Sequence, residues 1–486
     1  MLKKLWMFLL IFTLMLSVTG ISFADTPVQG DIKGNLVIVG GALGSSNAGV
    51  YEKFIELAGG KDKAKIGIIP AASGSLKSSK AFMADFIRYG VPEANVEIIP
   101  ITLSDDRSTK DVDESTWAEN VGKQEIADKI KGYTGIWFVG GDQSLITKAL
   151  LKADGTNTLA LDAIWEVYKN GDVLGGTSAG AAIMSDPMIS GGNSLGTINY
   201  GSTDTYIDEA DQYAAPVYIE KGLGFFPYGV TDQHFDMKAR LARLVFAADK
   251  YKDLSTRAFG VDENTAMVYS AATKTFEVIG PGSVTVVDVS KAVRDTKSKQ
   301  LSIKNVQLSF LTIGDTYDAA AGKFISGTTK DKTTGAEYFD IKGPVTDTGA
   351  LTSYGQFRPF IMYYLIDNAG TSEIKSYCFD EKGVGAEIVF RKTADTIGYW
   401  NYKDGLLDNY SASNVALDIN PIKVTIKPAS KATIQSASLE YVVQSGDVLW
   451  KIATRFNTTV EKLSELNKLI NPNALEIGQT LLIPQQ

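Results

Sequence analysis

The chain has 486 residues, of which 44% are hydrophobic and 21% charged, which is typical of a globular protein with two to four domains. Its formal net charge of −8 argues against a nucleic-acid partner, because such proteins usually carry a basic face. With a single cysteine, Cys378, and a single histidine, His234, the sequence excludes an intrachain disulfide and a zinc cluster, and we expect neither a cofactor nor a metal.

Residues 1–24 have the pattern of a signal peptide. Two lysines precede an apolar stretch at residues 5–16, and Ser22 and Ala24 supply the small residues that signal peptidase requires. An uncleaved membrane anchor is the alternative, but the apolar stretch is short for a membrane span. We therefore expect cleavage after Ala24 and a secreted protein.

Apolar runs alternate with amphipathic stretches over the next part of the chain. The runs NLVIVGGAL, AKIGIIPAASG, NVEIIPI, GIWFVGGDQS and GDVLGGTSAG resemble strands buried on both faces of a parallel sheet. Stretches between them, such as SSKAFMADFIRYG, have helical spacing of apolar residues. This order predicts an α/β fold with a doubly wound parallel sheet, whose ligands bind at the carboxyl ends of the strands. The glycines Gly40, Gly141 and Gly176 fall there.

From about residue 270 the sequence becomes strand-like, rich in Thr and Val with Gly, Asp and Asn turns. The segment 336–424 continues this pattern, and we interpret residues 330–435 as a β-rich accessory domain. The stretch KPASKATIQSAS is typical of a linker. It precedes a small separate unit at residues 440–485.

Residues 176–180 read Gly-Thr-Ser-Ala-Gly between an expected strand and an expected helix. A serine on such a turn stands clear of the sheet, near backbone N–H groups that can hold an oxyanion. Glycine-rich turns of this kind also cradle phosphates or simply pack closely. The motif alone therefore leaves a nucleophilic and a structural role for Ser178 equally open.

His234 is the candidate for the base that a nucleophilic serine needs. It lies in VTDQHFDMKARLARLVF, between an expected strand end and an expected helix that carries Lys238, Arg240 and Arg243. A lone histidine is more often structural, but polar neighbours at the boundary of an element favour a functional site.

An acidic residue must orient the imidazole of such a base. In FGVDENTAMVY we favour Glu263 for this role and take Asp262 as second, with an ordinary acidic turn as the alternative. The order Ser, His, acid differs from the order Ser, acid, His of α/β-hydrolases. An ordinary esterase would need an acid between the serine and the histidine, and three aspartates remain open for that: Asp204, Asp208 and Asp211.

Four motifs in order, GGTSAGA, the strand with GGDQ, DQHF with spaced basic residues after it, and DENTA, together resemble the cyanophycinase branch of peptidase family S51. The resemblance covers roughly residues 34–315. It implies a flavodoxin-like, class I glutamine amidotransferase-like catalytic domain, which we place at residues 34–325. It also implies a triad of Ser178, His234 and Glu263, with an oxyanion hole formed by the N–H groups of Gly141 and Ala179.

The same resemblance implies a substrate. Cyanophycin has a poly-aspartate backbone with arginines on its side-chain carboxyls, and this branch of the family releases β-Asp-Arg from it. The positions that match the family's substrate groove are Gln143, Asp232, Gln233, Lys238, Arg240 and Arg243.

One of these positions departs from the family pattern. Lys238 stands where arginine is expected and lacks the bidentate fork of a guanidinium group. This substitution weakens the cyanophycin assignment more than the peptidase assignment. A solvated helix face is the alternative for all three basic residues, although Arg240 and Arg243 are spaced to share a face. The alternative functions are an aspartyl or isoaspartyl dipeptidase, and a non-catalytic peptidoglycan-binding envelope protein.

The last unit, YVVQSGDVLWKIATRFNTTVEKLSELNKLINPNALEIGQTLLIP, resembles a LysM module over its whole length. The resemblance implies a βααβ fold that binds N-acetylglucosamine glycans, above all peptidoglycan, and hence a cell-wall-associated protein. The expected partners are thus an aspartyl-rich peptide and peptidoglycan, and a homodimer is left open. The residues expected in the glycan groove are Gly446, Asp447, Val448, Ile470 and Asn471, of which Gly446 and Asp447 have a turn-forming role as the alternative.

Overall fold

A computed structural model describes residues 32–486 except 111, 208–214, 348–350, 352–354, 404, 406, 426, 428–438, 470, 472–474 and 485–486. The predicted signal peptide and most of the predicted linker lie outside the described residues. So do three residues that the sequence analysis singled out: Asp208, Asp211 and Ile470. Within the described ranges, no helix has both the length and the apolarity to cross a membrane.

In the described part of the chain, nine strands form a first sheet of mixed direction, in the order β17-β16-β12-β11-β1-β5-β4-β2-β3. The five apolar runs of the N-terminal half lie side by side in it and are parallel, as predicted. They are β1 (Asn35–Val39), β2 (Ile66–Ile69), β3 (Val96–Ile98), β4 (Gly135–Phe138) and β5 (Val173–Thr177). Four antiparallel strands extend the sheet beyond β1, namely β11 (Ala266–Ser270), β12 (Thr275–Ile279), β16 (Thr316–Asp318) and β17 (Lys323–Ile325).

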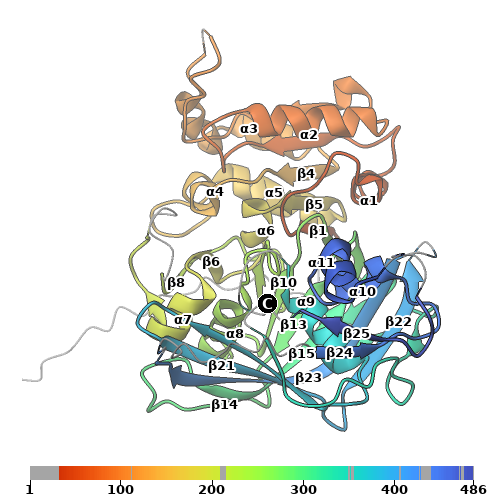
Figure 1. The fold of residues 1–486 in the computed structure, drawn as a ribbon. Helices are drawn as coiled ribbons and strands as arrows, with labels where there is room; N and C mark the ends of the chain where they lie inside the picture. Colours follow the sequence, from red (N-terminus) through yellow and green to blue (C-terminus); the bar gives the residue numbers. More distant parts are fainter. Residues whose placement is uncertain are drawn as a thin grey trace, which may run out of the picture. The chain divides into compact units, whose positions relative to one another are not determined.

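Helices lie on both faces of the parallel strands (Figure 1). One face is covered by α1 (Ala48–Leu57) and α2 (Lys77–Arg88), and the other by α5 (Leu159–Asn170) and α6 (Ala179–Ala182). The remaining helices of this part are α3 (Gln124–Ile130), α4 (Gln143–Leu150) and the short 3₁₀ segments η2 (Glu93–Asn95) and η3 (Glu114–Gly122).

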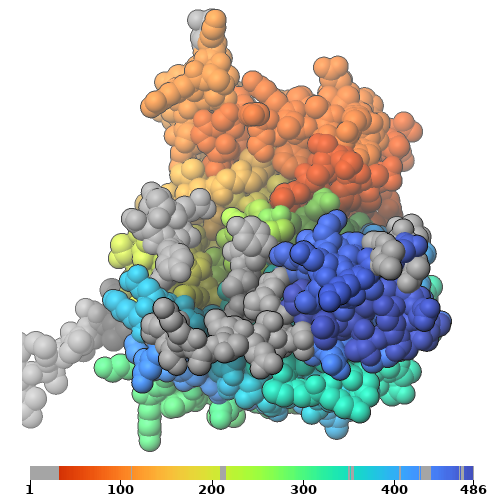
Figure 2. Space-filling view, viewed as in Figure 1, coloured from red at the N-terminus to blue at the C-terminus, as the bar shows by residue number. Residues whose placement is uncertain are grey.

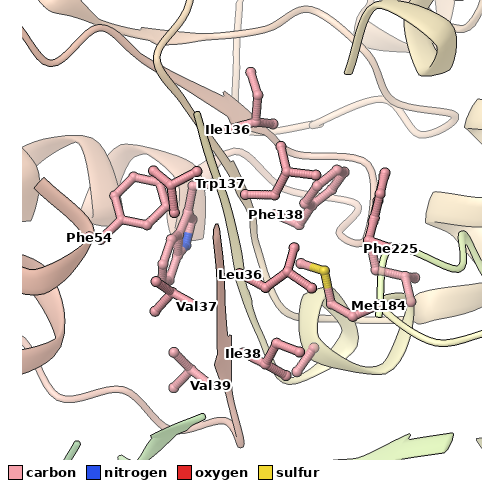
Figure 3. Packing of buried hydrophobic residues seen from close by; sticks show 14 of the residues in the cluster. Leu36, Val37, Ile38, Val39, Phe54, Ile136, Trp137, Phe138, Met184 and Phe225 are labelled. Atoms are coloured by element: carbon pink, nitrogen blue, oxygen red, sulfur yellow. The ribbon is translucent and has the colours of Figure 1, made fainter. Parts of the chain in front are cut away.

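Successive side chains of these strands point to opposite faces, and both faces are buried. Trp137 of β4 points toward Phe54 of α1, with ring centroids 5.1 Å apart (Figure 3). The next residue, Phe138, points the other way, toward Phe225. Burial on both faces explains why the strands read as continuous apolar runs.

A second sheet of eleven described strands has the main order β19-β20-β21-β23-β15-β13-β10-β9, with β14, β18 and β22 beside it. Strands of the predicted accessory domain join it directly, because β23 pairs antiparallel with β15. Its strands are β9 (Val230–Asp232), β10 (Arg257–Val261), β13 (Val284–Asp288), β14 (Val293–Arg294), β15 (Ile303–Leu311), β18 (Asp331–Lys332), β19 (Val345–Asp347), β20 (Glu373–Phe379), β21 (Val384–Arg391), β22 (Ile397–Lys403) and β23 (Leu407–Lys423).

One segment that the sequence analysis interpreted as strand-like is helical, and there the prediction is wrong. Residues 357–366 form α9 (Phe357–Ile361) and the π-helical η5 (Met362–Ile366). The buried residues Phe357, Phe360, Ile361 and Leu365 recur at helical spacing and pack in the second core. The same core includes residues of α7 (Ser194–Tyr200), α8 (Leu241–Lys250), β6 (Met188–Gly191) and β8 (Val217–Glu220). The strands β6 and β8 form a small third sheet with β7 (Ser202–Thr203).

The C-terminal unit runs through β24 (Leu439–Val442), α10 (Leu449–Arg455), α11 (Val460–Leu466) and β25 (Thr480–Ile483), and its two strands pair antiparallel. This unit, blue in Figure 2, contacts the region of the second sheet. The Arg455 guanidinium lies 4.0 Å from the ring centroid of Phe339, and the Tyr338 hydroxyl donates to the carbonyl of Ser445 (3.2 Å). Removal of the unit would therefore expose aromatic surface.

Candidate active site

Ser178 lies on the tight turn between β5 and α6. Its backbone dihedrals, φ 55° and ψ −112°, are unusual for a residue with a side chain. The turn is held because the Ser178 N–H donates to the Val39 carbonyl of the neighbouring strand β1 (3.0 Å). This geometry leaves the hydroxyl half-exposed at the carboxyl end of the sheet.

Small residues surround Ser178 because the backbone is crowded there. A Cβ on Gly176 would lie within 3.0 Å of the Gly180 carbonyl, and a Cβ on Gly180 would lie equally close to the Phe138 carbonyl. These contacts are with backbone atoms, which cannot move aside. The glycines let α6 approach β4 and β5 closely enough to form the turn.

A row of hydrogen bonds joins Ser178, His234 and Glu263. The Ser178 Oγ lies 2.9 Å from His234 Nε2, and His234 Nδ1 lies 2.5 Å from Glu263 Oε1. The histidine follows β9 and the glutamate follows β10, which are parallel neighbours in the second sheet. The row thus joins the first sheet to the second. With Nδ1–H donating to the carboxylate, Nε2 is the atom that accepts from the serine hydroxyl.

The surroundings favour a neutral imidazole. Burial lowers the pKa of His234, and the positive charges of Lys238 and Arg240 lower it further, while Glu263 opposes both. The ring is only 13% exposed. A neutral imidazole at pH 7 can accept a proton, as a general base must.

Glu263, rather than Asp262, contacts the imidazole. The Asp262 carboxylate accepts hydrogen bonds from the backbone N–H and the hydroxyl of Ser283, at 2.8 and 2.7 Å. Of the aspartates that an esterase-type site would need, Asp204 is exposed in the turn after β7.

The two residues expected to form an oxyanion hole flank the serine. Gly141 has φ +146°, and a Cβ there would overlap the Ala72 carbonyl, so only glycine fits. Ala179 is the first residue of α6, where an N–H has no acceptor within the helix. Gly141 lines an open pocket of about 380 Å³ together with Ser178 and His234.

Three of the predicted groove residues are used in contacts within the protein. The Arg243 guanidinium is 2% exposed and forms a bidentate pair with Asp232 (2.7 and 2.5 Å) while also donating to the Gly192 carbonyl (2.6 Å). Gln143 donates to the Ile189 and Ser190 carbonyls of β6, at 3.1 and 3.0 Å. These contacts fix the loops around the site.

The other three groove residues act on the serine or the histidine, Gln233 by proximity and Lys238 and Arg240 by charge. Gln233 Oε1 is 3.5 Å from the Ser178 hydroxyl, and Lys238 is exposed. Arg240 donates to the Gln233 carbonyl (2.6 Å). Arg240 and Arg243 lie on the same side of the chain, since both guanidinium groups meet Asp232 Oδ1, at 3.7 and 2.5 Å, although Arg240 is the N-cap of α8, which begins at Leu241. The positive φ of 51° at Ala239 interrupts the chain before the helix.

The sequence analysis did not identify Asp85, which lines the same pocket. Its carboxylate is buried and accepts from the hydroxyls of Ser45 (2.7 Å) and Tyr51 (2.9 Å). The available signal was a charged residue beside Phe82 and Phe86 on the apolar face of an amphipathic helix. The same carboxylate is paired with the Arg88 guanidinium (3.1 Å), so this wall of the pocket carries both charges.

An α/β fold that holds a serine, a neutral histidine and a carboxylate in one hydrogen-bonded row is characteristic of the serine hydrolases. Comparison with known proteins refines this class. The family model for peptidase family S51 matches residues 36–276, and the model for the LysM domain matches residues 441–484.

Curated relatives agree with both matches. A cyanophycinase of Synechococcus elongatus is 32% identical over 292 residues, covering 59% of this chain and 79% of the relative. One of Geminocystis herdmanii is 30% identical over 303 residues, covering 61% and 97%. In the C-terminal unit, the cortical fragment-lytic enzyme of Bacillus subtilis is 46% identical over 44 residues, covering 9% and 10%. The chain belongs to peptidase family S51 and is a cyanophycinase-like serine peptidase with a LysM domain.

Proposed function

We propose that this protein is a secreted exopeptidase that hydrolyses cyanophycin or related aspartyl and β-aspartyl peptides, releasing β-Asp-Arg, while its LysM domain holds it at the cell wall. The observation that carries the proposal is the row Ser178–His234–Glu263 at an open pocket. The choice of cyanophycin as substrate rests on the relatives, which are named cyanophycinases.

The row supports a two-step acyl transfer. His234 Nε2 takes the proton of the Ser178 hydroxyl while the oxygen attacks the scissile carbonyl. Glu263 holds the Nδ1–H and stabilises the imidazolium that forms. The N–H groups of Gly141 and Ala179 hold the oxyanion. The imidazolium then gives its proton to the leaving amine, and water releases the acyl group by the same route.

Substrate recognition follows from the charges around the pocket. Lys238 and Arg240 act on His234 by their positive charge, and the same charge suits the carboxylates of an aspartyl peptide. Gln233 is near enough to the serine to contact the substrate. The Asp85 carboxylate lines the pocket, where a substrate guanidinium would share it with Arg88. We assign Asp232, Arg243 and Gln143 to the support of these residues.

An aspartyl or isoaspartyl dipeptidase is the second candidate. Lys238 favours it, because an ammonium cannot replace the bidentate guanidinium expected for cyanophycin.

The finer architecture is also proposed. We take the parallel strands with helices on both faces as a flavodoxin-like, class I glutamine amidotransferase-like domain at residues 34–325. Residues 330–435 form the accessory region, and β24, α10, α11 and β25 form the βααβ fold of LysM at residues 440–485.

Product analysis tests the catalytic proposal. Purified protein and the Ser178→Ala variant are incubated with cyanophycin and with Asp-X and isoAsp-X dipeptides, and the products are identified by mass spectrometry. The native protein should release β-Asp-Arg, and the variant should lose on the order of a million-fold in turnover. Its unfolding temperature should stay unchanged, because alanine suits the crowded turn. An active variant would exclude Ser178 as nucleophile, and cleavage of dipeptides alone would favour the dipeptidase.

The LysM proposal rests on the match to the LysM family model and on the exposure of two of the expected groove residues. Val448 is 41% exposed and Asn471 is exposed, whereas the Asp447 carboxylate is occupied by the Tyr441 hydroxyl and the Gln444 N–H. We assign Gly446 and Asp447 to the turn and Val448, Ile470 and Asn471 to the glycan. Deletion of residues 438–486 should abolish sedimentation with purified peptidoglycan and leave dipeptide hydrolysis almost unchanged. Continued sedimentation would place the wall contact elsewhere.

Secretion is tested by N-terminal sequencing of the protein from the medium and wall of a Gram-positive host. Asp25 should be the first residue, because we expect cleavage after Ala24. Retention of residues 1–24 in the mature protein would contradict the signal peptide.

A further inference from the structure

The segment that follows His234 has a backbone that needs support from outside. His234 has φ 47° and Ala239 has φ 51°, both in the left-handed region although neither is a glycine. Each such residue costs about 1–3 kcal/mol and persists only where surrounding contacts hold it. The contacts that hold this segment therefore decide where the imidazole lies.

Asp236 connects this segment to the accessory region. Its side chain is buried, and Oδ1 accepts the N–H of Phe357 (2.9 Å) while Oδ2 accepts the N–H of Arg358 (3.4 Å). Both donors begin α9, in the accessory region. Two residues after the histidine, the chain is thus fixed to a segment more than a hundred positions away.

An aromatic contact reinforces this attachment. Phe235, directly after the histidine, is 1% exposed and packs edge-on against Phe357, with ring centroids 6.2 Å apart. Gly260 of β10 leaves room for the Phe235 ring, because a Cβ there would lie within 3.0 Å of it. The Phe235 ring and the Asp236 carboxylate therefore both contact the first turn of α9.

Asp236 also reaches the glutamate side of the row. Its N–H donates to Asp262 Oδ1 (3.2 Å), and Asp262 immediately precedes Glu263. The Asp262 carboxylate is fixed in turn by Ser283. One residue thus connects the loop of the histidine, the loop of the glutamate and the accessory helix.

The buried carboxyl groups of Asp236 and Asp262 lie close together, and this proximity is electrostatically unfavourable when both are ionised. Burial and the neighbouring charge of Asp262 raise the pKa of Asp236 to about 7, while the Arg358 charge opposes them. An apolar residue would fill the position without that cost, but it would offer no acceptor to the two N–H groups of α9.

We propose that Asp236 is a positioning residue through which the accessory segment at Phe357 sets the place of His234. The inference rests on the proposed role of His234 and extends the functional site to the accessory region. Residues 357–361 then act as part of the catalytic framework, although they touch no reacting atom. Displacement of a catalytic group by about 1 Å is enough to cost roughly a hundred-fold in rate.

The test uses the full chain, with a purification tag that contains no histidine. Because His234 is the only histidine, labelling with ¹³C,¹⁵N-histidine gives NMR signals from this ring alone. Asp236→Ala removes both acceptors, and Asp236→Asn retains one acceptor oxygen. The control is Asp367→Asn, since Asp367 is also buried and accepts a backbone N–H, that of Tyr338 (2.8 Å), within the accessory region.

Asp236→Ala should shift the imidazole signals and lower kcat on cyanophycin about 10- to 100-fold, with KM within two-fold of the native value. Asp236→Asn should lie between this variant and the native protein. Asp367→Asn should lower the unfolding temperature without moving the imidazole signals or kcat. Unshifted signals or an unchanged kcat in Asp236→Ala would overturn the proposal.

If neither Asp236 variant folds, Phe357→Pro provides the same test, because proline is tolerated in the first turn of a helix and removes the N–H that Asp236 Oδ1 accepts. Shifted imidazole signals with a lower kcat support the proposal, and native values overturn it. The NMR readout needs no substrate. Shifted signals in a protein that cleaves neither cyanophycin nor dipeptides would refute the proposed function while leaving the link from α9 to the histidine in place.

Discussion

Ser178 and His234 come from two sheets that position them by different physical means. On the first sheet the serine turn depends on close backbone packing, since there is no room for a methyl group at Gly176 or Gly180. On the second sheet the histidine loop is held by buried carboxylates, those of Asp232 and Asp236. The nucleophile side should therefore respond to added volume, and the base side to changes of charge and pH.

The largest difference in kcat on the base side is expected between variants of the neighbouring residues Glu263 and Asp262. Glu263→Gln keeps the shape of the side chain but removes the charge that orients the imidazole, and kcat should fall on the order of 10⁴-fold. Asp262→Asn alters the contacts with Ser283 and with the Asp236 N–H, none of which touches the imidazole, and should reduce kcat far less. Steady-state kinetics on cyanophycin or the dipeptides that are cleaved provides the measurement. Equal losses in both variants would mean that the two carboxylates act as one unit.

Removal of a buried charge should have the next largest effect, on stability. Asp232→Ala leaves the Arg243 guanidinium buried without its partner, which should lower the free energy of unfolding by about 3–5 kcal/mol. The exposed pair of Lys131 and Glu166 is the control, and Glu166→Ala should cost less than about 1 kcal/mol. Urea denaturation followed by circular dichroism measures both. Similar losses would show that burial does not distinguish the two pairs.

Added volume tests the nucleophile side. Gly180→Ala places a Cβ against the Phe138 carbonyl and should lower the free energy of unfolding by about 1–3 kcal/mol. Gly122→Ala meets nothing within 4 Å and should change it by less than about 0.5 kcal/mol. The same denaturation experiment applies. An unchanged free energy of unfolding in Gly180→Ala would mean that the turn adapts to the added methyl group and does not depend on close backbone packing.

The smallest effect expected is a shift in the pH profile. A protonated imidazole cannot accept the serine proton, so kcat/KM should fall as pH drops through the pKa of His234, which burial lowers below about 6.5. Lys238→Met removes a charge that lowers this pKa, so the acidic limb should move to higher pH. Profiles between pH 4 and 9 measure the shift. A limb that stays in place would exclude Lys238 as an electrostatic neighbour of the base.

The same pKa shift affects stability with a defined sign. The unfolded chain binds a proton at His234 more readily than the native state does, so the contribution of this residue to stability is lost as pH falls below about 6.5. Asp236 acts in the opposite direction, because its raised pKa makes burial of the carboxyl increasingly unfavourable between about pH 4 and about pH 7.

The five parallel strands were predictable, because burial on both faces leaves a continuous apolar run in the sequence. The residues Ser178, His234 and Glu263 were also predictable, since each follows a strand and carries the side chain that the chemistry needs. The pairing of β15 with β23 was not, because a strand does not encode its distant partner. The helix at residues 357–366 was interpreted as strand because a short apolar run fits either period.

The buried pair of Asp232 and Arg243 shows a different limit. Charged residues are usually exposed, so the sequence favoured a groove or a solvated surface for Arg243. Only the folded chain brings Asp232 and the Gly192 carbonyl to its guanidinium. The break before α8 was hidden for a similar reason, since an alanine with positive φ has no sequence signature.

We expect the pairing of β15 with β23 to delay the onset of activity during biosynthesis. Residues 303–311 find their partner only after residues up to about 423 have been synthesised, and such non-local pairing is among the slowest steps of folding. The nucleophile turn is complete within the first 180 residues, but the second sheet and α9 close around the histidine loop much later. We therefore expect a nascent chain to hold the Ser178 turn before the loop of His234 is fixed, and hydrolytic activity to arise only after residues up to about 423 have been synthesised.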